Sequence, residues 1–430
     1  MAPHRVPLAR RSLLVVPALG TLLATSACGG GGGAEASAGG STGFSFTYAT
    51  SNNMESPYET LAKAYMEENP EISIDLQPQP NDRYGETLRT QLQAGNAPDV
   101  VQTVPGAGQD RSVLPLAEAG FLEPLGESAA SLVPSGEEAL YTHEGELYAQ
   151  PVDFTVTGFV YNSTAAEDAG VDEFPDASQE LEELCGRLTG EGRSVVAMAG
   201  AAPPNAGLTA MAVSATRVYA DEPDWNEKRA DGKVSFADSE GWRETLETVI
   251  DLQDSGCLQP GAEGAGFDAI TNGLAQGTSL GAFIPGGAAT EIQRTAPESE
   301  FVIEAFPPAT GGDARILAGP NYSLSVNAGS QQKEAAQAFL DWVAEPEQAQ
   351  LFAELSGVLP VTGLEDVDLS ATEYAPVADL LENGSYSALP NSAWPNQSVY
   401  DALSTGVQGL LTDQRTVEDV LTAMDEAWEG

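Results

Sequence analysis

The chain has 430 residues and a formal net charge of −46, from 64 acidic and 18 basic side chains. So acidic a surface repels the phosphates of nucleic acids, which argues against nucleic-acid binding, and it also repels anionic lipid head groups. The length suits two domains, and 42% of the residues are hydrophobic, which is enough to fill their cores.

The first 27 residues follow the order of an export signal. Three arginines within the first 11 residues precede the apolar stretch SLLVVPALGTLLA and the small residues TSA. Cys28 follows, and a cysteine at this place resembles a bacterial lipobox, although Thr25 stands where Leu is usual. We expect 1–27 to be a signal peptide and 28–43 a flexible linker, lipid-anchored to the outer face of the cell membrane. An ordinary secretory signal and a twin-arginine signal are the alternatives.

Two further cysteines lie in the body of the chain, Cys185 and Cys257. Because an exported protein meets an oxidising compartment, a disulfide between them is expected, the alternative being two buried free thiols. Their separation in the sequence does not decide whether their Cα atoms approach closely enough. The chain has only two histidines, His4 and His143, and no Cys-x-x-Cys, so no zinc site is expected. No other metal or cofactor is expected either.

The first half of the body alternates strands and helices. Phe44, Phe46 and Tyr48 alternate in FSFTYAT, which predicts a strand. Next come, in order, a helix in YETLAKAYMEENP, a strand in EISIDLQP, a helix in DRYGETLRTQLQAGNAPDV and a strand in DVV. This order is typical of a parallel α/β sheet, which binds ligands in the loops at the carboxyl ends of its strands. Those loops are TSNN (50–53) and QTVPG (102–106).

The second half repeats the pattern. Short apolar runs predict strands in GFVYN, SVVAMAG, SLGAFIP and YSLSVNAGS. Helical spacing predicts helices in SQELEELCGRLTG, in GWRETLETVIDLQDSG and in the segment after Ser330, which is placed to cap that helix. Thr416 and Asp419 have the spacing of a capping box at the start of a last helix in TVEDVLTAMDEAW.

Six stretches, in this order, resemble one family. They are YMEENPEISIDL, LQAGNAPDVVQ, GELYAQPVDFTVTGFVYN, GLAQGTSLGAF, SLSVNAGSQQKEAAQAFLDWVAEPEQAQLFAELSGVLP and RTVEDVLTAMDEAW. Together they are similar to bacterial ABC-transporter extracellular solute-binding proteins of family 1, the carbohydrate-binding, maltose-binding-protein-like group. The resemblance covers nearly all of the chain after the linker. It implies an α/β fold of the two-lobed periplasmic-binding-protein type (type II), with hinge strands and a ligand cleft between the lobes.

The resemblance also implies where the chain passes between the lobes. The expected crossings are PVDFT (151–155), AGPNY (318–322) and VLPVT (358–362). Lobe 1 would then comprise 44–152 plus 322–358, and lobe 2 would comprise 156–318 plus 363–430. Both body cysteines fall in lobe 2, which makes the disulfide geometrically easier.

The function implied is capture of a mono- or oligosaccharide and its delivery to the membrane permease of an ABC importer. A ligand that contacts both lobes stabilises their closed arrangement, which a permease can distinguish. Outside the expected linker the sequence contains no Gly-x-Ser-x-Gly elbow, and the whole chain has no phosphate loop and no His-Glu-x-x-His, so we expect no catalytic residue. We also expect a monomeric binding protein. Two alternatives are a secreted glycan hydrolase and a binding protein for a non-sugar polar solute.

Sugar sites need flat apolar faces for C–H surfaces and fixed polar groups for hydroxyls. The loops after the first and third strands and the expected crossings offer such groups. The candidates there are Ser51, Asn52, Gln102, Thr103, Asp153, Phe154, Thr155, Asn321 and Tyr322. For the loop residues the alternative is turn formation, in which a side chain bonds its own backbone.

Further candidates lie in the second half. Asn205 is expected in a loop, and Trp394 and Tyr400 lie where relatives carry an aromatic that stacks on sugar, the alternative being helix packing. After SLGAFI many relatives place a tryptophan, whereas this chain has Gly286 and Gly287. Either stacking comes from elsewhere, or the backbone approaches the ligand closely at these glycines. This departure weakens a maltose-like assignment.

Overall fold

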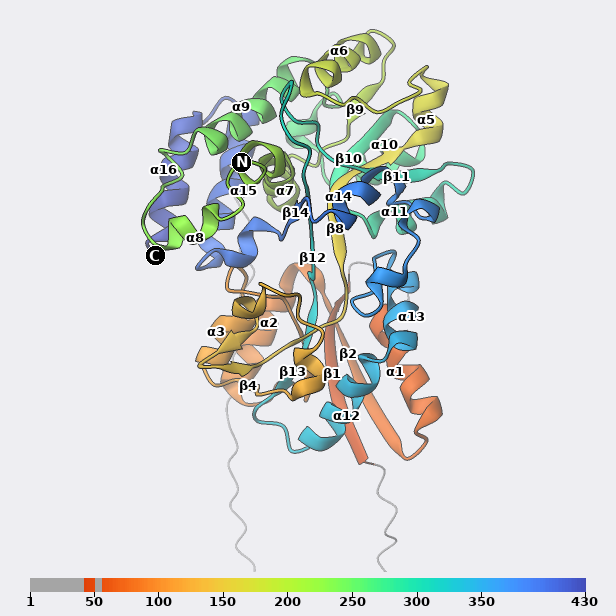
Figure 1. The fold of residues 1–430 in the computed structure, drawn as a ribbon, viewed down its shortest axis with the longest axis vertical. Coiled ribbons are helices and arrows are strands. Elements are labelled where there is room, and N and C mark those ends of the chain that lie inside the picture. The colour runs from red at the N-terminus through yellow and green to blue at the C-terminus, as the bar shows by residue number, and fades with distance from the viewer. Residues whose placement is uncertain (1–41, 51–55) are drawn as a thin grey trace, which may run out of the picture. The chain divides into compact units, whose positions relative to one another are not determined.

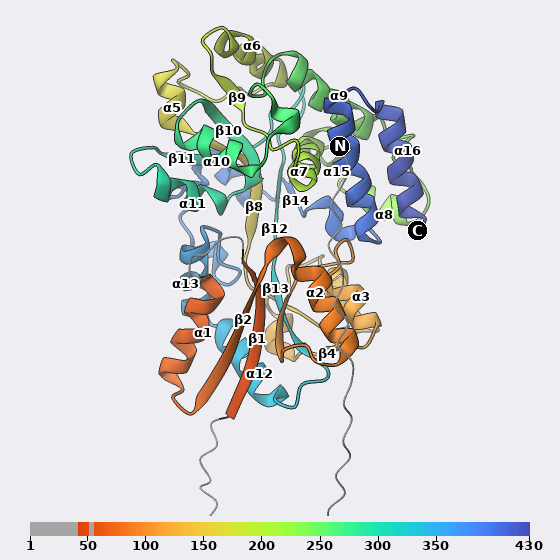
Figure 2. The same cartoon turned by 180° about the vertical axis from the view of Figure 1, so that it is seen from behind.

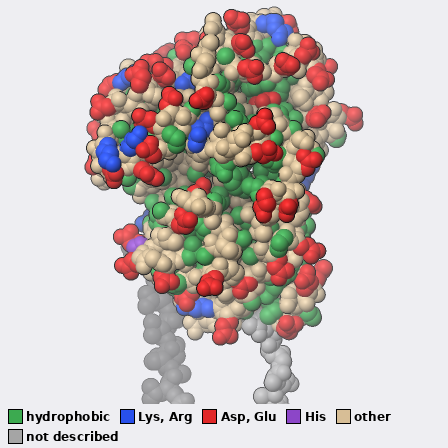
Figure 3. Space-filling view, viewed as in Figure 1, with side chains coloured by type: hydrophobic (Ala, Val, Ile, Leu, Met, Phe, Trp, Pro, Cys, Tyr) green, Lys and Arg blue, Asp and Glu red, His purple; other side chains and the backbone are tan. Residues whose placement is uncertain are grey.

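The structure is a computed structural model that describes residues 42–50 and 56–430. The expected signal peptide, most of the linker with Cys28, and the candidates Ser51 and Asn52 lie outside these residues. The described chain contains two six-stranded sheets, each accompanied by helices (Figures 1 and 2). Acidic side chains are spread over the whole visible face, with few basic ones among them (Figure 3).

The first sheet has the strand order β2-β1-β3-β13-β4, and β7 also pairs with β13. Strand β1 is parallel to β2 and β3, whereas β13 runs antiparallel to β3. The strands of this sheet and the helices in the same part of the chain are β1 Thr42–Thr50, α1 Pro57–Glu68, β2 Ile72–Pro80, α2 Asn81–Ala94, β3 Val100–Thr103, α3 Val113–Glu118, β4 Leu122–Glu123, α4 Glu127–Ala130, η1 Glu138–Leu140, β7 Gln150–Pro151, β13 Ser323–Asn327, α12 Lys333–Val343 and α13 Pro346–Ser356. Strands β5 Thr142–His143 and β6 Glu146–Leu147 form a separate two-stranded sheet.

The second sheet has the order β14-β12-β8-β10-β9, and β11 also pairs with β8. Its elements are β8 Thr155–Asn162, α5 Ser163–Asp168, α6 Ser178–Thr189, β9 Ser194–Val196, α7 Pro203–Ser214, the π-helical turn η2 Ala215–Tyr219, α8 Trp225–Ala230, α9 Glu240–Asp254, η3 Ala262–Gly264, α10 Phe267–Ala275, β10 Ser279–Pro285, α11 Ala288–Thr295, β11 Phe301–Glu304, β12 Ile316–Gly319, η4 Leu364–Asp366, η5 Leu369–Ala371, η6 Ala375–Val377, α14 Ala378–Glu382, β14 Tyr386–Ser387, η7 Pro390–Ala393, α15 Gln397–Leu411 and α16 Val417–Trp428.

The alternation in β1 places its aromatic rings in the first core. Phe44, Phe46 and Tyr48 are at most 3% exposed. The rings of Phe44 and Phe46 lie 5.6 and 5.8 Å from that of Phe339 on α12. The strand–helix order of the first half and the α/β class are therefore confirmed.

Two local predictions have different outcomes. The capping box forms as expected, because the N–H of Thr416 donates to Asp419 at 2.9 Å and the N–H of Asp419 donates to the Thr416 hydroxyl at 3.2 Å. The prediction that Ser330 caps the following helix is wrong. Helix α12 begins at Lys333 with Gln332 at the N-cap position, and the Ser330 hydroxyl accepts the N–H of Gln332 at 2.9 Å and donates to the carboxylate of Asp99 at 2.6 Å. The strand expected in SVVAMAG is also shorter than predicted, ending at Val196.

The chain passes between the two sheets in a few short segments. Strand β7 belongs to the first sheet and β8 to the second, so 152–154 is the first crossing. Strands β12 and β13 are joined by 320–322, which is the second. Phe154 exchanges two backbone hydrogen bonds with Leu359, at 2.9 and 3.0 Å, which ties 358–362 to the first crossing. The lobe bounds given above stay a prediction.

A cluster of aromatic rings and a disulfide lie in the core of the second sheet. Trp225, Trp242 and Trp394 are at most 1% exposed and pack around Phe236, with ring centroids 4.8 to 5.8 Å from it. Cys185 and Cys257 are joined by a disulfide, with Cα atoms 4.6 Å apart, which links α6 to the chain just after α9.

Candidate ligand-binding site

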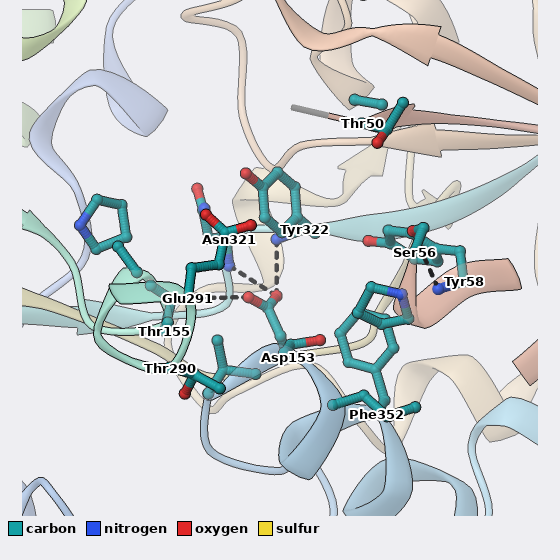
Figure 4. A pocket seen from close by; sticks show the side chains of 18 of the residues that line it. Thr50, Ser56, Tyr58, Asp153, Thr155, Thr290, Glu291, Asn321, Tyr322 and Phe352 are labelled. Atoms are coloured by element: carbon teal, nitrogen blue, oxygen red, sulfur yellow. Dashed lines mark hydrogen bonds between the residues drawn. The ribbon is translucent and has the colours of Figure 1, made fainter. Parts of the chain in front are cut away.

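A cavity of about 300 Å³ lies where the crossings, the first sheet and α11 meet. Segments far apart in the sequence supply its walls (Figure 4). From the first sheet and its helices come Ala49, Thr50, Ser56, Pro57, Tyr58, Asn81, Gln102, Phe352, Leu355 and Ser356. From the crossings come Asp153, Thr155, Asn321, Tyr322 and Val358. From the second sheet and α11 come Pro285, Gly287, Ala288, Thr290, Glu291 and Arg294.

Asp153 is the buried charged group of this cavity. Its Oδ1 accepts the backbone N–H groups of Tyr322 at 2.7 Å and Asn321 at 3.2 Å, and its Oδ2 accepts the hydroxyl of Thr155 at 2.5 Å. Burial raises the pKa of Asp153 from its ordinary 3.8 to about 6, although these hydrogen bonds lower it. These hydrogen bonds hold the carboxylate in place at the wall of the cavity.

Tyr58 and Gln102 form a second polar pair. The Gln102 side chain accepts the N–H of Ala49 at 2.8 Å and donates to the Tyr58 hydroxyl at 3.1 Å. Burial raises the pKa of Tyr58 well above its ordinary value, with a further contribution from the charge of Asp153. Tyr58 therefore stays a neutral phenol. Its hydroxyl oxygen accepts the hydrogen bond from the Gln102 amide, so its own proton remains free to be donated to a ligand.

Aromatic and apolar faces complete the side of the first sheet. The ring of Phe352 on α13 lies 5.0 Å from that of Tyr58, and Tyr322 lines the cavity from the second crossing. Figure 4 shows Asp153 between Tyr322 and Phe352. Ring faces beside fixed acceptors and donors suit a ligand that has both C–H surfaces and hydroxyls.

The opposite wall is the start of α11. A Cβ atom added at Gly287 would lie 2.6 Å from the carbonyl oxygen of Ser356, so a side chain there would force the two walls apart. Thr290, Glu291 and Arg294 follow on the same helix and line the cavity. Gly287 therefore allows the start of α11 to lie close to the end of α13.

Six of the sequence candidates line the cavity: Gln102, Asp153, Thr155, Gly287, Asn321 and Tyr322. The other described candidates lie elsewhere. Thr103 is fully buried, with its hydroxyl 3.0 and 2.9 Å from those of Ser323 and Ser325 on the neighbouring strand. Phe154 is buried among hydrophobic residues of the second sheet, with its ring edge-on to that of Tyr386 and the two ring centroids 5.6 Å apart. Both side chains therefore have structural partners.

The remaining candidates are also occupied by structural contacts. Asn205, expected in a loop, lies instead in the first turn of α7, where its amide accepts the N–H of Ala199 at 2.9 Å and donates to the carbonyl of Phe283 at 3.1 Å. A Cβ atom at Gly286 would lie 2.9 Å from the hydroxyl of Tyr374, so this glycine packs under a side chain. Trp394 belongs to the aromatic cluster described above, and the Tyr400 hydroxyl donates to the carbonyl of Pro204 at 2.6 Å.

Sequence reasoning missed Tyr58, Phe352 and Thr290. One available signal was that α1 starts at Pro57, with Ser56 as its N-cap, a few residues after the carboxyl end of β1, which is where ligands of parallel sheets bind. Phe352 and Thr290 carried no comparable signal, because their helices look like ordinary amphipathic helices.

Among the residues that the structure describes, none of the helices has the length and apolar character that a membrane crossing requires. Similarity to known proteins extends over most of the chain. A binding protein of Brucella abortus (strain 2308) is 24% identical over 376 residues, which are 80% of this chain and 87% of the relative.

Two solved structures share the fold. One, from work on xylan utilisation by Caldanaerobius polysaccharolyticus, has a TM-score of 0.75 at 19% identity and covers 89% of this chain and 99% of its own. The other is an ABC transporter solute-binding protein of Thermotoga lettingae bound with α-D-tagatose, with a TM-score of 0.73 at 19% identity, covering 90% and 98%. The sequence profile of the bacterial extracellular solute-binding proteins matches residues 48–350. The chain therefore belongs to the family of bacterial extracellular solute-binding proteins.

Proposed function

We propose that this protein is the extracytoplasmic receptor of an ABC importer and that it captures a sugar in the cavity around Asp153. The observation that carries the proposal is a buried carboxylate, that of Asp153, in a cavity that the rings of Tyr58, Tyr322 and Phe352 also line. The tagatose complex of the Thermotoga lettingae protein and the xylan context of the Caldanaerobius protein support a carbohydrate ligand.

The size of the cavity favours a small sugar. Its volume of about 300 Å³ stands at the lower end of the range of small-molecule sites. We therefore propose a mono- or disaccharide. Asp153 would accept hydrogen bonds from its hydroxyls, Gln102 would accept or donate, and Tyr58 would donate. The rings of Tyr322 and Phe352 would cover its C–H faces.

We further propose that Cys28 is lipidated, that the linker 28–43 tethers a monomeric body to the membrane, and that the two lobes have the bounds 44–152 plus 322–358 and 156–318 plus 363–430. The family supports an extracellular location and a permease partner. Mass spectrometry of the mature N-terminus tests the anchor: an unmodified chain that begins anywhere except at residue 28 contradicts it.

The sugar proposal is tested by thermal shift over a panel of sugars, amino acids, polyamines and osmolytes, followed by calorimetry of the best ligands. A sugar should raise the melting temperature by mass action. If only non-sugars do so, the proposal is wrong. Incubation with glycans, with analysis of products, tests the hydrolase alternative, which any glycan cleavage lost on substitution of Asp153 would favour.

A matched pair of variants tests the role of Asp153. Asp425 also accepts two backbone N–H groups, from Phe236 and Ala237 at 2.9 Å, but it lies away from the cavity. Asp153→Asn should weaken sugar binding by roughly 10- to 100-fold, the range for a hydrogen bond to a charged group. Asp425→Asn should leave the affinity unchanged. Equal losses of sugar affinity in both variants would show that Asp153 has no specific role in binding the sugar.

A further inference from the structure

Arg111 lies between two tyrosine rings next to the cavity. It is in the loop between β3 and α3, and its guanidinium carbon is 5.5 Å from the ring centre of Tyr84 and 5.5 Å from that of Tyr322. Tyr322 lines the cavity, whereas Tyr84 and Arg111 do not. The guanidinium therefore connects a ring of the first core to a ring of the proposed site.

The ring of Tyr84 is held rigidly. It is 1% exposed, and its hydroxyl accepts the N–H of Gln102 at 2.9 Å and lies 2.9 and 3.1 Å from the carbonyl oxygens of Gln102 and Thr47. These groups belong to β3 and β1, so the ring is fixed to the two central parallel strands of the sheet.

The backbone of Arg111 is held as well. Its carbonyl accepts the N–H of Val104 at 3.3 Å, and the carbonyl of Val104 accepts the N–H of Val113 at 3.0 Å. The hydroxyl of the adjacent Ser112 accepts the N–H of Gln109 at 2.9 Å. The loop thus presents Arg111 from a fixed position.

Tyr322, by contrast, makes its hydrogen bonds through its backbone, while its ring packs against the hydrophobic core of the first sheet. Its N–H donates to Asp153 and its carbonyl accepts the N–H of Val152 at 3.2 Å. Within 42–50 and 56–430, no hydrogen bond engages its hydroxyl. The orientation of the ring therefore depends on what packs against it, and Arg111 is the charged group that does so.

The environment of Arg111 strengthens this contact. Its Nη1 is buried without a hydrogen-bond partner, and the part of the chain that the structure describes offers it no ion pair. A cation that has lost water attracts an aromatic face more strongly than an exposed one does. Its charge also acts on Tyr58, whose pKa it lowers against the effect of Asp153.

We infer that Arg111 is a positioning residue of the site: it holds the ring of Tyr322 in place as the wall on which the sugar stacks, without touching the sugar. The ligand part of this inference rests on the proposed function. The contact between Arg111 and Tyr322 stands independently of it.

A double-mutant cycle with Tyr322→Leu tests the inference on the ligand. Arg111→Gln should weaken sugar binding about tenfold, and Arg111→Lys, which keeps the charge but not the planar stack, should weaken it less. In the Tyr322→Leu background, Arg111→Gln should have no further effect. Equal losses in both backgrounds, or no loss in either, would overturn the inference.

Arg217 supplies the matched control. Its guanidinium lies 5.3 Å over the ring of Phe306 in the second core, away from the cavity. Arg217→Gln should lower the melting temperature without changing the affinity for sugar. A change in affinity as large as that of Arg111→Gln would mean that the losses report general destabilisation, and the positioning role would be rejected.

A measurement without sugar separates this inference from the proposed function. In protein labelled with fluorotyrosine, the ¹⁹F signal of Tyr322 is identified by its loss in Tyr322→Phe. Arg111→Gln should shift and broaden that signal in the free protein, and Arg111→Lys should do so less. An unchanged signal rejects the positioning role even if sugar binds. A changed signal supports it even if no sugar binds and the sugar proposal fails.

Discussion

The buried carboxylate of Asp153 should make the stability of this protein depend on pH in an unusual direction. The relevant substitution is Asp153→Asn, which keeps the shape of the side chain. The Asn carbonyl can still accept the N–H groups of Asn321 and Tyr322, and its amide can donate to the hydroxyl of Thr155. The variant thus removes the charge while keeping three hydrogen bonds.

The magnitude follows from the pKa. Burial raises the pKa of Asp153 from 3.8 to about 6, and at about 1.36 kcal/mol per pKa unit this difference corresponds to about 3 kcal/mol. Between these two pH values the folded protein holds a proton that the unfolded chain has lost. The contribution of Asp153 to the free energy of unfolding is therefore fully present below pH 4 and is lost as the pH rises through about 6.

The assay is urea unfolding of the wild type and of Asp153→Asn at half-unit steps from pH 4 to pH 8. Subtracting the two free energies of unfolding cancels the titration of the other acidic residues. The wild type should lose up to about 3 kcal/mol relative to the variant over this range, most of it below pH 6.5. A difference that is flat with pH, or that rises with pH, would refute the reasoning.

Three further substitutions have clear expectations. A Cβ atom at Gly108 would lie 1.9 Å from the carbonyl oxygen of Asn391, so Gly108→Ala should cost about 1–3 kcal/mol by overpacking, measured by urea unfolding. No loss would mean that the two segments separate freely. Replacing Cys185 and Cys257 by Ser opens a loop with a sequence separation of 72 and should cost about 4 kcal/mol in unfolding free energy; a cost near zero would contradict the loop-entropy account. Trp394→Phe should cost roughly 1–3 kcal/mol in stability yet leave sugar affinity unchanged by calorimetry, since the ring packs in the aromatic cluster and does not line the cavity; a selective loss of affinity would return Trp394 to the site.

The order of strands and helices in the first sheet could be predicted because it depends on local patterns. The alternation of Phe44, Phe46 and Tyr48 and the periodic helix after it are visible in the sequence, and the structure confirms both. The end of SVVAMAG could not be placed, because an apolar run does not reveal where strand pairing stops. Ser330 lies two residues before Gln332, the N-cap residue of α12, and the sequence pattern does not show at which residue a helix begins.

The candidate site was predictable where the chain itself changes sheet. Asp153, Asn321 and Tyr322 lie at crossings that the family resemblance locates, and all three line the cavity. Trp394 illustrates the limit, because a buried aromatic ring and a ligand-stacking ring have the same sequence signature. Phe352 illustrates the converse, since its place on α13 looks like an ordinary core position until the cavity is seen beside it.

The hydrogen bonds of Asp153 bear on how such a receptor can evolve. The carboxylate that lines the cavity also joins the two crossings, so a substitution that changed it for a new ligand would disturb the connection between the sheets. Glu291 and Arg294 on α11 also line the cavity, and both are exposed. We therefore expect new ligand preferences to arise by substitutions along α11, while the crossing residues stay as they are.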